Sequence, residues 1–202
     1  MSIIKTSSGK EFEQIDGESI LSSAKKAGIN FQYSCKTGRC SSCKCKLISG
    51  KTLTYSDEIG LTKSEKKDGY ILSCIRYAEN NIEIEVDDLG DIEIPKAKVL
   101  PSKINTLKML SEDVIRVILR IPPNSNFKII PGQYVDIVGP NNVKRSYSVA
   151  NHVTDNLVEL HIKKVTSGEL SRYWFENAKS DDLLRLKGPN GTFFLRENQK
   201  DI

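Results

Sequence analysis

The chain has 202 residues, enough for two domains of about 100 residues that each bury a core. Hydrophobic residues make up 38% of it and charged residues 28%, and no apolar run approaches the roughly 20 residues that span a bilayer, so we expect no role for a membrane. Residues 1–90 are neutral overall, and the net charge of +4 comes from the second half, where it is too small and scattered to indicate nucleic-acid binding.

The amino-terminal residues have no cationic stretch followed by an apolar core, the pattern of a secretion signal. We therefore predict a cytoplasmic protein. Five cysteines in such a protein are more often metal ligands or redox centres than disulfide partners.

In chain order, the first predicted helix covers residues 18–28, with Ile20, Leu21 and Ala24 on one face and Gly28 as its stop. Residues 31–45 are small, polar or cysteine, which predicts a loop wrapped around a ligand. Strict alternation over residues 82–86 predicts a half-buried strand.

Turn residues and prolines then predict a linker over residues 91–98, between one domain at 1–90 and a second at 99–202. The second half has β-prone segments separated by turn residues, and one helical stretch. We predict an antiparallel β-barrel with strands at 114–121, 134–138, 147–149 and 158–165 and one helix at 170–178.

Four cysteines carry the strongest signal. Cys35, Cys40 and Cys43 form C-x4-C-x2-C, and 30 residues separate Cys43 from Cys74. This spacing is typical of plant-type [2Fe-2S] ferredoxins, whose cluster needs four thiolates, and it predicts an α+β, β-grasp-like first domain. Zinc also takes four thiolates, but its ligands usually come in two close pairs in the sequence.

Small residues in the cysteine loop, Gly38 with Ser34, Ser41 and Ser42, would let backbone amides approach the sulfur atoms. Cys45 breaks the ligand spacing at the expected start of a strand. We predict that it is a small core residue.

Three short motifs follow one another in the second half: residues 131–136 (P-G-Q-Y-V-D), 145–148 (R-S-Y-S) and 168–171 (G-E-L-S). Arg145 is suited to a pyrophosphate, Tyr147 to a flat ring, and Ser148 to the edge of that ring. The helix that begins after Gly168 would present backbone amides to phosphates.

These motifs resemble the ferredoxin-NADP reductase superfamily, in which R-x-Y-S binds flavin and G-x-x-S binds its phosphates. The resemblance implies FAD as cofactor. The candidate FAD-binding residues are Arg145, Ser146, Tyr147, Ser148, His161, Ile162, Lys163, Gly168, Glu169, Leu170 and Ser171.

With a ferredoxin domain placed first, the chain is similar to two groups of reductases within that superfamily. One group serves oxygenases. The other serves a pyridoxamine-phosphate-dependent dehydrase of a CDP-4-keto-6-deoxyhexose in dideoxysugar synthesis for lipopolysaccharide, and the segment 188–197 carries the closer likeness to it. The resemblance implies an enzyme that passes electrons from FAD to the [2Fe-2S] cluster and on to such a partner.

The superfamily continues into a nicotinamide-binding domain of about 100 residues, and no glycine-rich dinucleotide loop occurs in this sequence. We therefore expect either a truncated sequence, which the family favours, or a protein that receives its electrons from elsewhere. In both cases we expect that this chain does not oxidise NAD(P)H by itself.

Two further functions stay open on the sequence alone: a flavin-free electron carrier and a zinc-binding interaction module. His152 and His161 stand apart from the cysteines, which argues against a Rieske centre or a catalytic base. The aromatic residues 173–175 are predicted to pack in the core.

Overall fold

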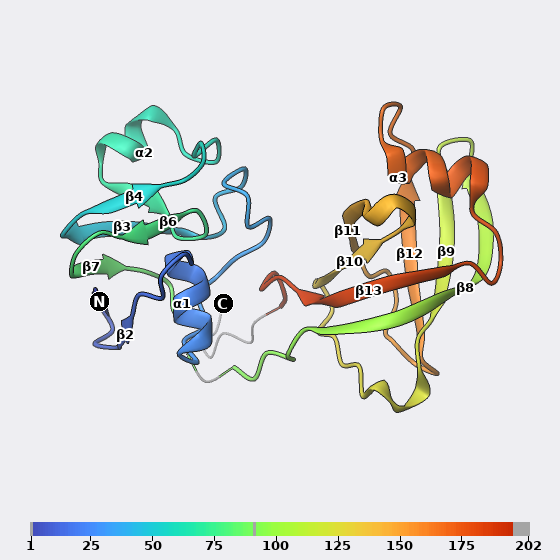
Figure 1. Ribbon diagram of the computed structural model, residues 1–202, viewed down its shortest axis with the longest axis horizontal. Helices are drawn as coiled ribbons and strands as arrows, with labels where there is room; N and C mark the ends of the chain where they lie inside the picture. The colour runs from blue at the N-terminus through green and yellow to red at the C-terminus, as the bar shows by residue number, and fades with distance from the viewer. Residues whose placement is uncertain (1, 91, 196–202) are drawn as a thin grey trace, which may run out of the picture. The chain divides into compact units, whose positions relative to one another are not determined.

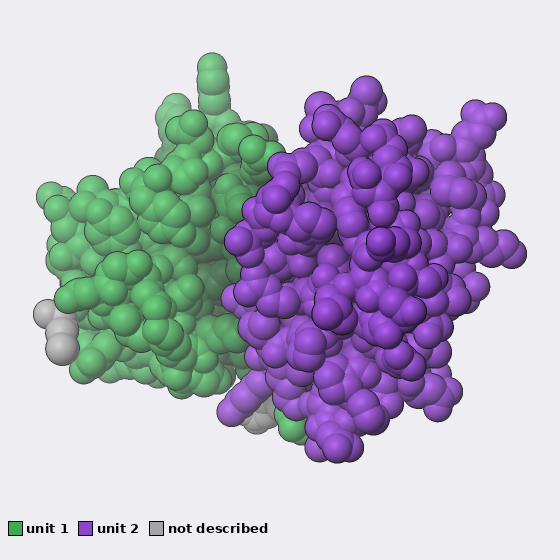
Figure 2. Space-filling model, turned by 45° about the vertical axis from the view of Figure 1, so that its right-hand side comes forward, with its two compact units in different colours: residues 1–93 green, residues 94–202 purple. Residues whose placement is uncertain are grey.

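The computed structural model describes residues 2–90 and 92–195. The chain forms two compact units, residues 1–93 and 94–202 (Figures 1 and 2). The end of the predicted second domain, including the last two residues of the segment 188–197, lies outside the described residues. Among the helices that are described, none is both long enough and apolar enough to cross a bilayer.

The first unit is built on a five-stranded sheet in the order β2-β1-β7-β3-β5, in which β1 and β7 are parallel and the other pairs antiparallel. Strands β4 and β6 form a separate two-stranded sheet in the same unit. The bounds are β1 Ile3–Thr6, β2 Glu11–Glu13, α1 Ile20–Lys26, β3 Lys44–Ser49, β4 Thr52–Thr54, α2 Lys63–Lys67, β5 Tyr70–Leu72, β6 Arg76–Ala78 and β7 Ile82–Glu85. This is the mixed organisation predicted for the first domain.

Helix α1 forms as its sequence predicts, although it is shorter at both ends. The Ser19 side chain caps its first turn by accepting a hydrogen bond from the Ser22 amide at 3.2 Å. Ile20 and Ala24 bury one face, and Gly28 ends the helix with a positive φ of 80°.

A buried ion pair holds the segment before α2 against the cysteine-bearing part of this unit. The Arg76 guanidinium donates to both carboxylate oxygens of Glu58, at 2.8 and 2.7 Å, and the Leu72 amide donates to the same carboxylate at 2.9 Å. Burial raises the pKa of Glu58, but these hydrogen bonds outweigh it and hold the pKa below its ordinary value.

The second unit contains a six-stranded antiparallel sheet in the order β11-β10-β13-β8-β9-β12. The bounds are β8 Lys98–Ser111, β9 Val114–Arg120, η1 Pro123–Ser125, β10 Tyr134–Val138, η2 Pro140–Asn142, β11 Lys144–Ser148, β12 Leu157–Lys163, α3 Glu169–Arg172, η3 Tyr173–Asn177 and β13 Leu183–Asn190. Within the part of the chain that the structure describes, no ladder joins the edge strands β11 and β12. Closure of the predicted barrel is therefore not confirmed.

The strands β8 and β13 were missed by the sequence pattern, because a proline lies in each. Pro101 faces Arg185 of β13, but the pairing of β8 with β9 begins only at Lys103. At Pro101, strand β8 is thus paired on one side, and a residue without an N–H is tolerated at such a position.

The predicted helix over 170–178 is a short α-helical turn followed by a π-helical turn, with the Ala178 amide donating to the Tyr173 carbonyl at 2.8 Å. Two aromatic side chains anchor the wider turn: Tyr173 donates to Asp182 at 2.8 Å, and Trp174 donates to Tyr147 at 2.9 Å. The predicted packing role of Trp174, which is 1% exposed, is confirmed.

We predict that Glu58→Gln destabilises the first unit by about 2–4 kcal/mol at pH 7, since it leaves the Arg76 charge without its carboxylate. Calorimetric unfolding of the whole chain measures this. The Glu58 pKa is lowered in the folded state, so the contribution is complete above the ordinary pKa and is lost as the pH falls through the folded value.

The matched control is Glu11→Gln, which removes an ion pair with Lys5 whose two side chains are more than half exposed. It should cost less than about 1 kcal/mol. Equal stabilities of the two variants at pH 7 would contradict the structural role of Glu58.

Candidate functional site

The four cysteines of the predicted cluster motif gather as two pairs. The sulfur atoms of Cys35 and Cys40 lie 3.1 Å apart without a disulfide. Cys43 donates a hydrogen bond to Cys74, which raises the pKa of Cys43 and lowers that of Cys74. The loop before β3 supplies three of these thiols, and the turn after β5 supplies the fourth.

Backbone amides approach these sulfur atoms. The Thr37 amide lies 3.4 Å from the Cys35 sulfur, and the Gly38 amide donates to Cys74. Burial raises the pKa of Cys35, but hydrogen bonds from Thr37 and Cys40 outweigh it and bring the pKa to about 6. The loop therefore favours the thiolate, the form that binds metals.

Two glycines make the close packing of this loop possible. A Cβ on Gly38, whose φ is 72°, would lie 2.7 Å from the Asp57 carbonyl oxygen. A Cβ on Gly60 would lie 2.4 Å from the Cys40 carbonyl oxygen. The segment that Glu58 fixes is thus in direct backbone contact with the cysteine loop.

The thiol pairs can be compared with the ligand set of a two-iron cluster. Such a cluster needs a pair of thiolates at each iron. The pairs Cys35–Cys40 and Cys43–Cys74 supply that number.

Cys45 lies outside both pairs. It is 2% exposed on β3, opposite Ile71, and burial raises its pKa to about 12. The prediction that it is a core residue is confirmed.

In the second unit, β11 presents an exposed cation and a half-buried ring two residues apart. Arg145 is exposed, and Tyr147 packs edge-on against Trp174 with ring centroids 6.2 Å apart. The neighbouring Ser146 donates to the buried Asp136 at 2.6 Å. A fixed aromatic ring beside an exposed guanidinium suits a ligand that joins a planar ring to phosphates.

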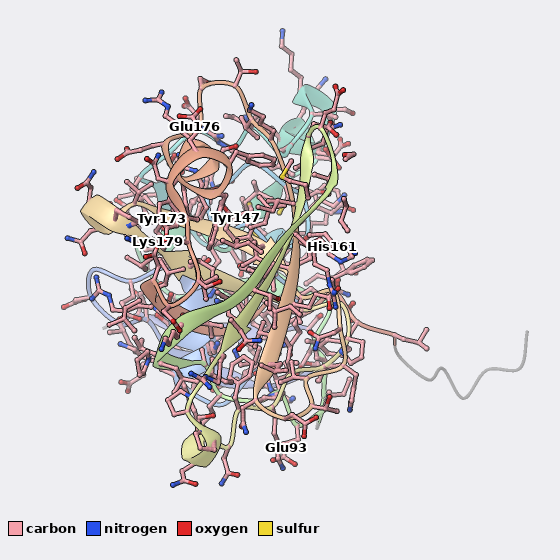
Figure 3. All side chains as sticks on the ribbon, turned by 90° about the vertical axis from the view of Figure 1, so that its right-hand side faces the viewer. Glu93, Tyr147, His161, Tyr173, Glu176 and Lys179 are labelled. Carbon is pink, nitrogen blue, oxygen red and sulfur yellow. The ribbon has the colours of Figure 1, made fainter. Side chains whose placement is uncertain are left out.

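The sequence motif did not reveal how Tyr147 is held. Its hydroxyl accepts the hydrogen bond of the Trp174 indole, and burial raises its pKa, so the phenol stays protonated. Trp174 comes from the helical segment after Gly168, and this contact brings two of the three motifs together. Figure 3 shows Tyr147 beneath that segment and His161 apart from it.

The candidate residues on β12 point to different sides of the strand. Ile162 is in the core at 2% exposure, while His161 contacts Glu159 at 2.8 Å and Lys163 lies 3.7 Å from Asp113. The structure records no contact from these described side chains to Arg145 or Ser171.

The segment 168–171 is bound into the fold at several points. Leu170 is 1% exposed in the core, Ser171 accepts a hydrogen bond from the Val165 amide at 2.8 Å, and Glu169 accepts one from Asn141 at 3.3 Å. A cavity of about 390 Å³ lies next to this segment and is lined in part by Glu169, Leu170 and Arg172.

Comparison with protein families divides the chain as the structure does. Residues 3–79 match the model of the 2Fe-2S iron-sulfur cluster binding domain, and residues 101–195 match that of the oxidoreductase FAD-binding domain.

Two curated relatives and one solved structure are similar over most of the chain. CDP-6-deoxy-L-threo-D-glycero-4-hexulose-3-dehydrase reductase from Yersinia pestis is 38% identical over 93% of this chain and 57% of its own length. The ferredoxin–NAD(P)(+) reductase component of the naphthalene 1,2-dioxygenase system of Pseudomonas putida is 30% identical over 90% and 54%. The crystal structure of an Amycolatopsis cytochrome P450 reductase aligns with a TM-score of 0.73 at 25% identity, over 100% of this chain and 61% of that one. The chain thus spans little more than half the length of the curated relatives.

We predict that Tyr147→Phe lowers the stability of the second unit by about 1–3 kcal/mol, because it leaves the buried indole N–H of Trp174 without an acceptor. Trp174 is the single tryptophan, so its fluorescence during urea unfolding reports on this unit alone. Ser148→Ala, an exposed change on the same strand, is the control. A Tyr147→Phe variant as stable as this control would contradict the prediction.

Proposed function

Because residues 3–79 belong to the 2Fe-2S cluster binding domain family and residues 101–195 to the oxidoreductase FAD-binding domain family, we propose that the chain transfers electrons from FAD through the cluster to a partner enzyme. The observation that carries this proposal is the pairing of four thiols in a chain whose other domain is of the FAD-binding family. A flavin exchanges electrons in pairs or singly, whereas a [2Fe-2S] cluster carries one.

The proposed cluster ligands are Cys35, Cys40, Cys43 and Cys74. Their two-by-two arrangement supports this assignment, as do the amides of Thr37 and Gly38 that lie next to the sulfur atoms. These amides would stabilise the negative charge of the thiolates and so raise the reduction potential. Glu58 and Arg76 would keep the loop in the geometry that the cluster requires.

For FAD, the proposed contacts are those of the three motifs. Arg145 would pair with the pyrophosphate, and Tyr147 would lie against the flavin ring with its hydroxyl held by Trp174. Ser146, Ser148, Gly168, Glu169, Leu170 and Ser171 would contribute backbone or hydroxyl contacts. His161, Ile162 and Lys163 would bind through the edge of β12 that lies opposite β9, since the core position of Ile162 leaves only its backbone available.

We propose a pyridoxamine-phosphate-dependent dehydrase of a CDP-4-keto-6-deoxyhexose as the electron acceptor, in keeping with the function in the name of the Yersinia relative. The alternative is an oxygenase component, which the Pseudomonas relative supports. Oxidation of NAD(P)H is part of the same proposal for the whole protein. Purified dehydrase and oxygenase components, offered in turn to the reduced chain, would separate the two acceptors.

We predict that the anaerobically purified chain contains about two irons, two sulfides and one FAD per molecule. Dithionite should bleach the visible spectrum. Replacing Cys43 or Cys74 by Ser should abolish the cluster absorption, while Cys45→Ser, the matched control in the core, should retain it. A colourless protein with one zinc ion would refute the proposal. A protein with a normal cluster and no flavin would instead support the alternative of a flavin-free electron carrier.

A second prediction concerns FAD. Arg145→Gln should weaken FAD binding on the order of tenfold or more, because it removes a charge-assisted contact with phosphate. Equilibrium dialysis of the chain against FAD measures this, with Arg185→Gln, another arginine of the same sheet, as control. Equal affinities of the two variants would exclude Arg145 from the site.

A further inference from the structure

A cavity of about 340 Å³ opens beside Cys74 in the first unit. Its walls include Lys25, Tyr33, Lys36, Tyr55 and Glu18, which come from helix α1, the residues just before it, the cysteine loop and the segment after β4. None of these five residues takes part in the proposed binding of the cluster or of FAD.

Two lysine ammonium groups stand over one aromatic ring in this cavity. The Nζ atom of Lys36 lies 4.4 Å and that of Lys25 lies 5.4 Å from the centroid of the Tyr33 ring. Lys25 also donates to the Tyr33 hydroxyl at 3.4 Å. Because Tyr33 is 4% exposed, it is a fixed platform that keeps both cations at the cavity.

Glu18 is the carboxylate among the residues that line the cavity, and it pairs with Lys26. In the neighbouring cysteine loop, residues 34–46 contain four basic residues and no acidic one, and one of the four, Lys44, pairs with Glu65. Asp57 adds a negative charge to this region, so the described residues beside Cys74 still carry more positive than negative charge.

Tyr55 connects this cavity to the backbone of Cys74. Its side chain is 61% exposed, and its hydroxyl donates to the Cys74 carbonyl oxygen at 2.7 Å. A molecule bound at the cavity would therefore be one hydrogen bond away from the main chain of a proposed cluster ligand.

We propose that the electron acceptor docks on this cavity through an acidic surface, with its carboxylates placed between Lys25 and Lys36. This inference rests on the proposed function. One electron leaves the reduced cluster for the acceptor, so the cluster is oxidised and the acceptor is reduced, and no bond is made or broken. The charge of the cavity selects a partner of opposite sign.

The test uses two one-electron acceptors of opposite surface charge, the acidic cytochrome b5 and the basic cytochrome c. The whole chain is reduced with dithionite, desalted anaerobically and mixed with each cytochrome in a stopped-flow instrument. The variants are Lys25→Gln/Lys36→Gln and the control Lys5→Gln/Lys51→Gln, whose lysines are exposed and do not line the cavity. Visible spectra recorded first establish that each variant holds its cluster, so a failure of the proposed function is seen separately.

At low salt, the double change at the cavity should slow the reduction of cytochrome b5 by about tenfold and flatten its dependence on ionic strength. The reduction of cytochrome c should stay the same or become faster, and the control variant should behave as wild type. Lys25→Arg/Lys36→Arg should restore the rate with cytochrome b5.

Three results would overturn the inference. One is an unchanged rate with cytochrome b5. Another is an equal slowing with both cytochromes, which would indicate a change in cluster potential. The third is a slower reaction with the small anion hexacyanoferrate(III) but not with cytochrome b5, which would assign the cavity to small anions.

Discussion

The first unit depends on bringing Cys74 against a loop that ends 30 residues earlier in the sequence. Chain entropy opposes this meeting, and both the Glu58–Arg76 pair and the pairing of β3 with β5 help to offset that entropy. One carboxylate accepts hydrogen bonds from Arg76 and from the Leu72 amide, on either side of Cys74. The same segment then packs its backbone against the cysteine loop at Gly38 and Gly60.

In the second unit, the aromatic ring of Tyr147 lies on the edge strand β11 and must be fixed there. In the described part of the chain, β11 forms a ladder with β10 and none on its other side, so backbone pairing holds the strand of Tyr147 from one side. Trp174 supplies the missing constraint, with a hydrogen bond and an edge-on ring contact. A residue that fills the core thereby also sets the position of a candidate flavin contact.

In both units, buried side-chain contacts hold the candidate site residues in place. In the first unit, the paired thiols adjoin a cavity with two cations, and Glu18, the carboxylate among its lining residues, pairs with Lys26. The proposed electron transfer needs an acceptor that can come close to the cluster, and Cys74 is among the residues that line this cavity. The charge on that cavity is the feature by which this chain would distinguish among acceptors.

The sequence by itself determined the two domain families and the presence of helix α1 before Gly28, because cysteine spacing, R-x-Y-S and a helix-ending glycine are local patterns. Only the tertiary structure showed that Pro101 and Pro189 lie within strands β8 and β13. A strand tolerates a proline where the missing N–H is not needed for pairing, and the side on which a strand is paired cannot be read from its sequence. The tertiary structure also decided the partners of Glu58 and Tyr147. Contacts between side chains far apart in the chain produce no periodic pattern in the sequence, so they can be identified only in the folded structure.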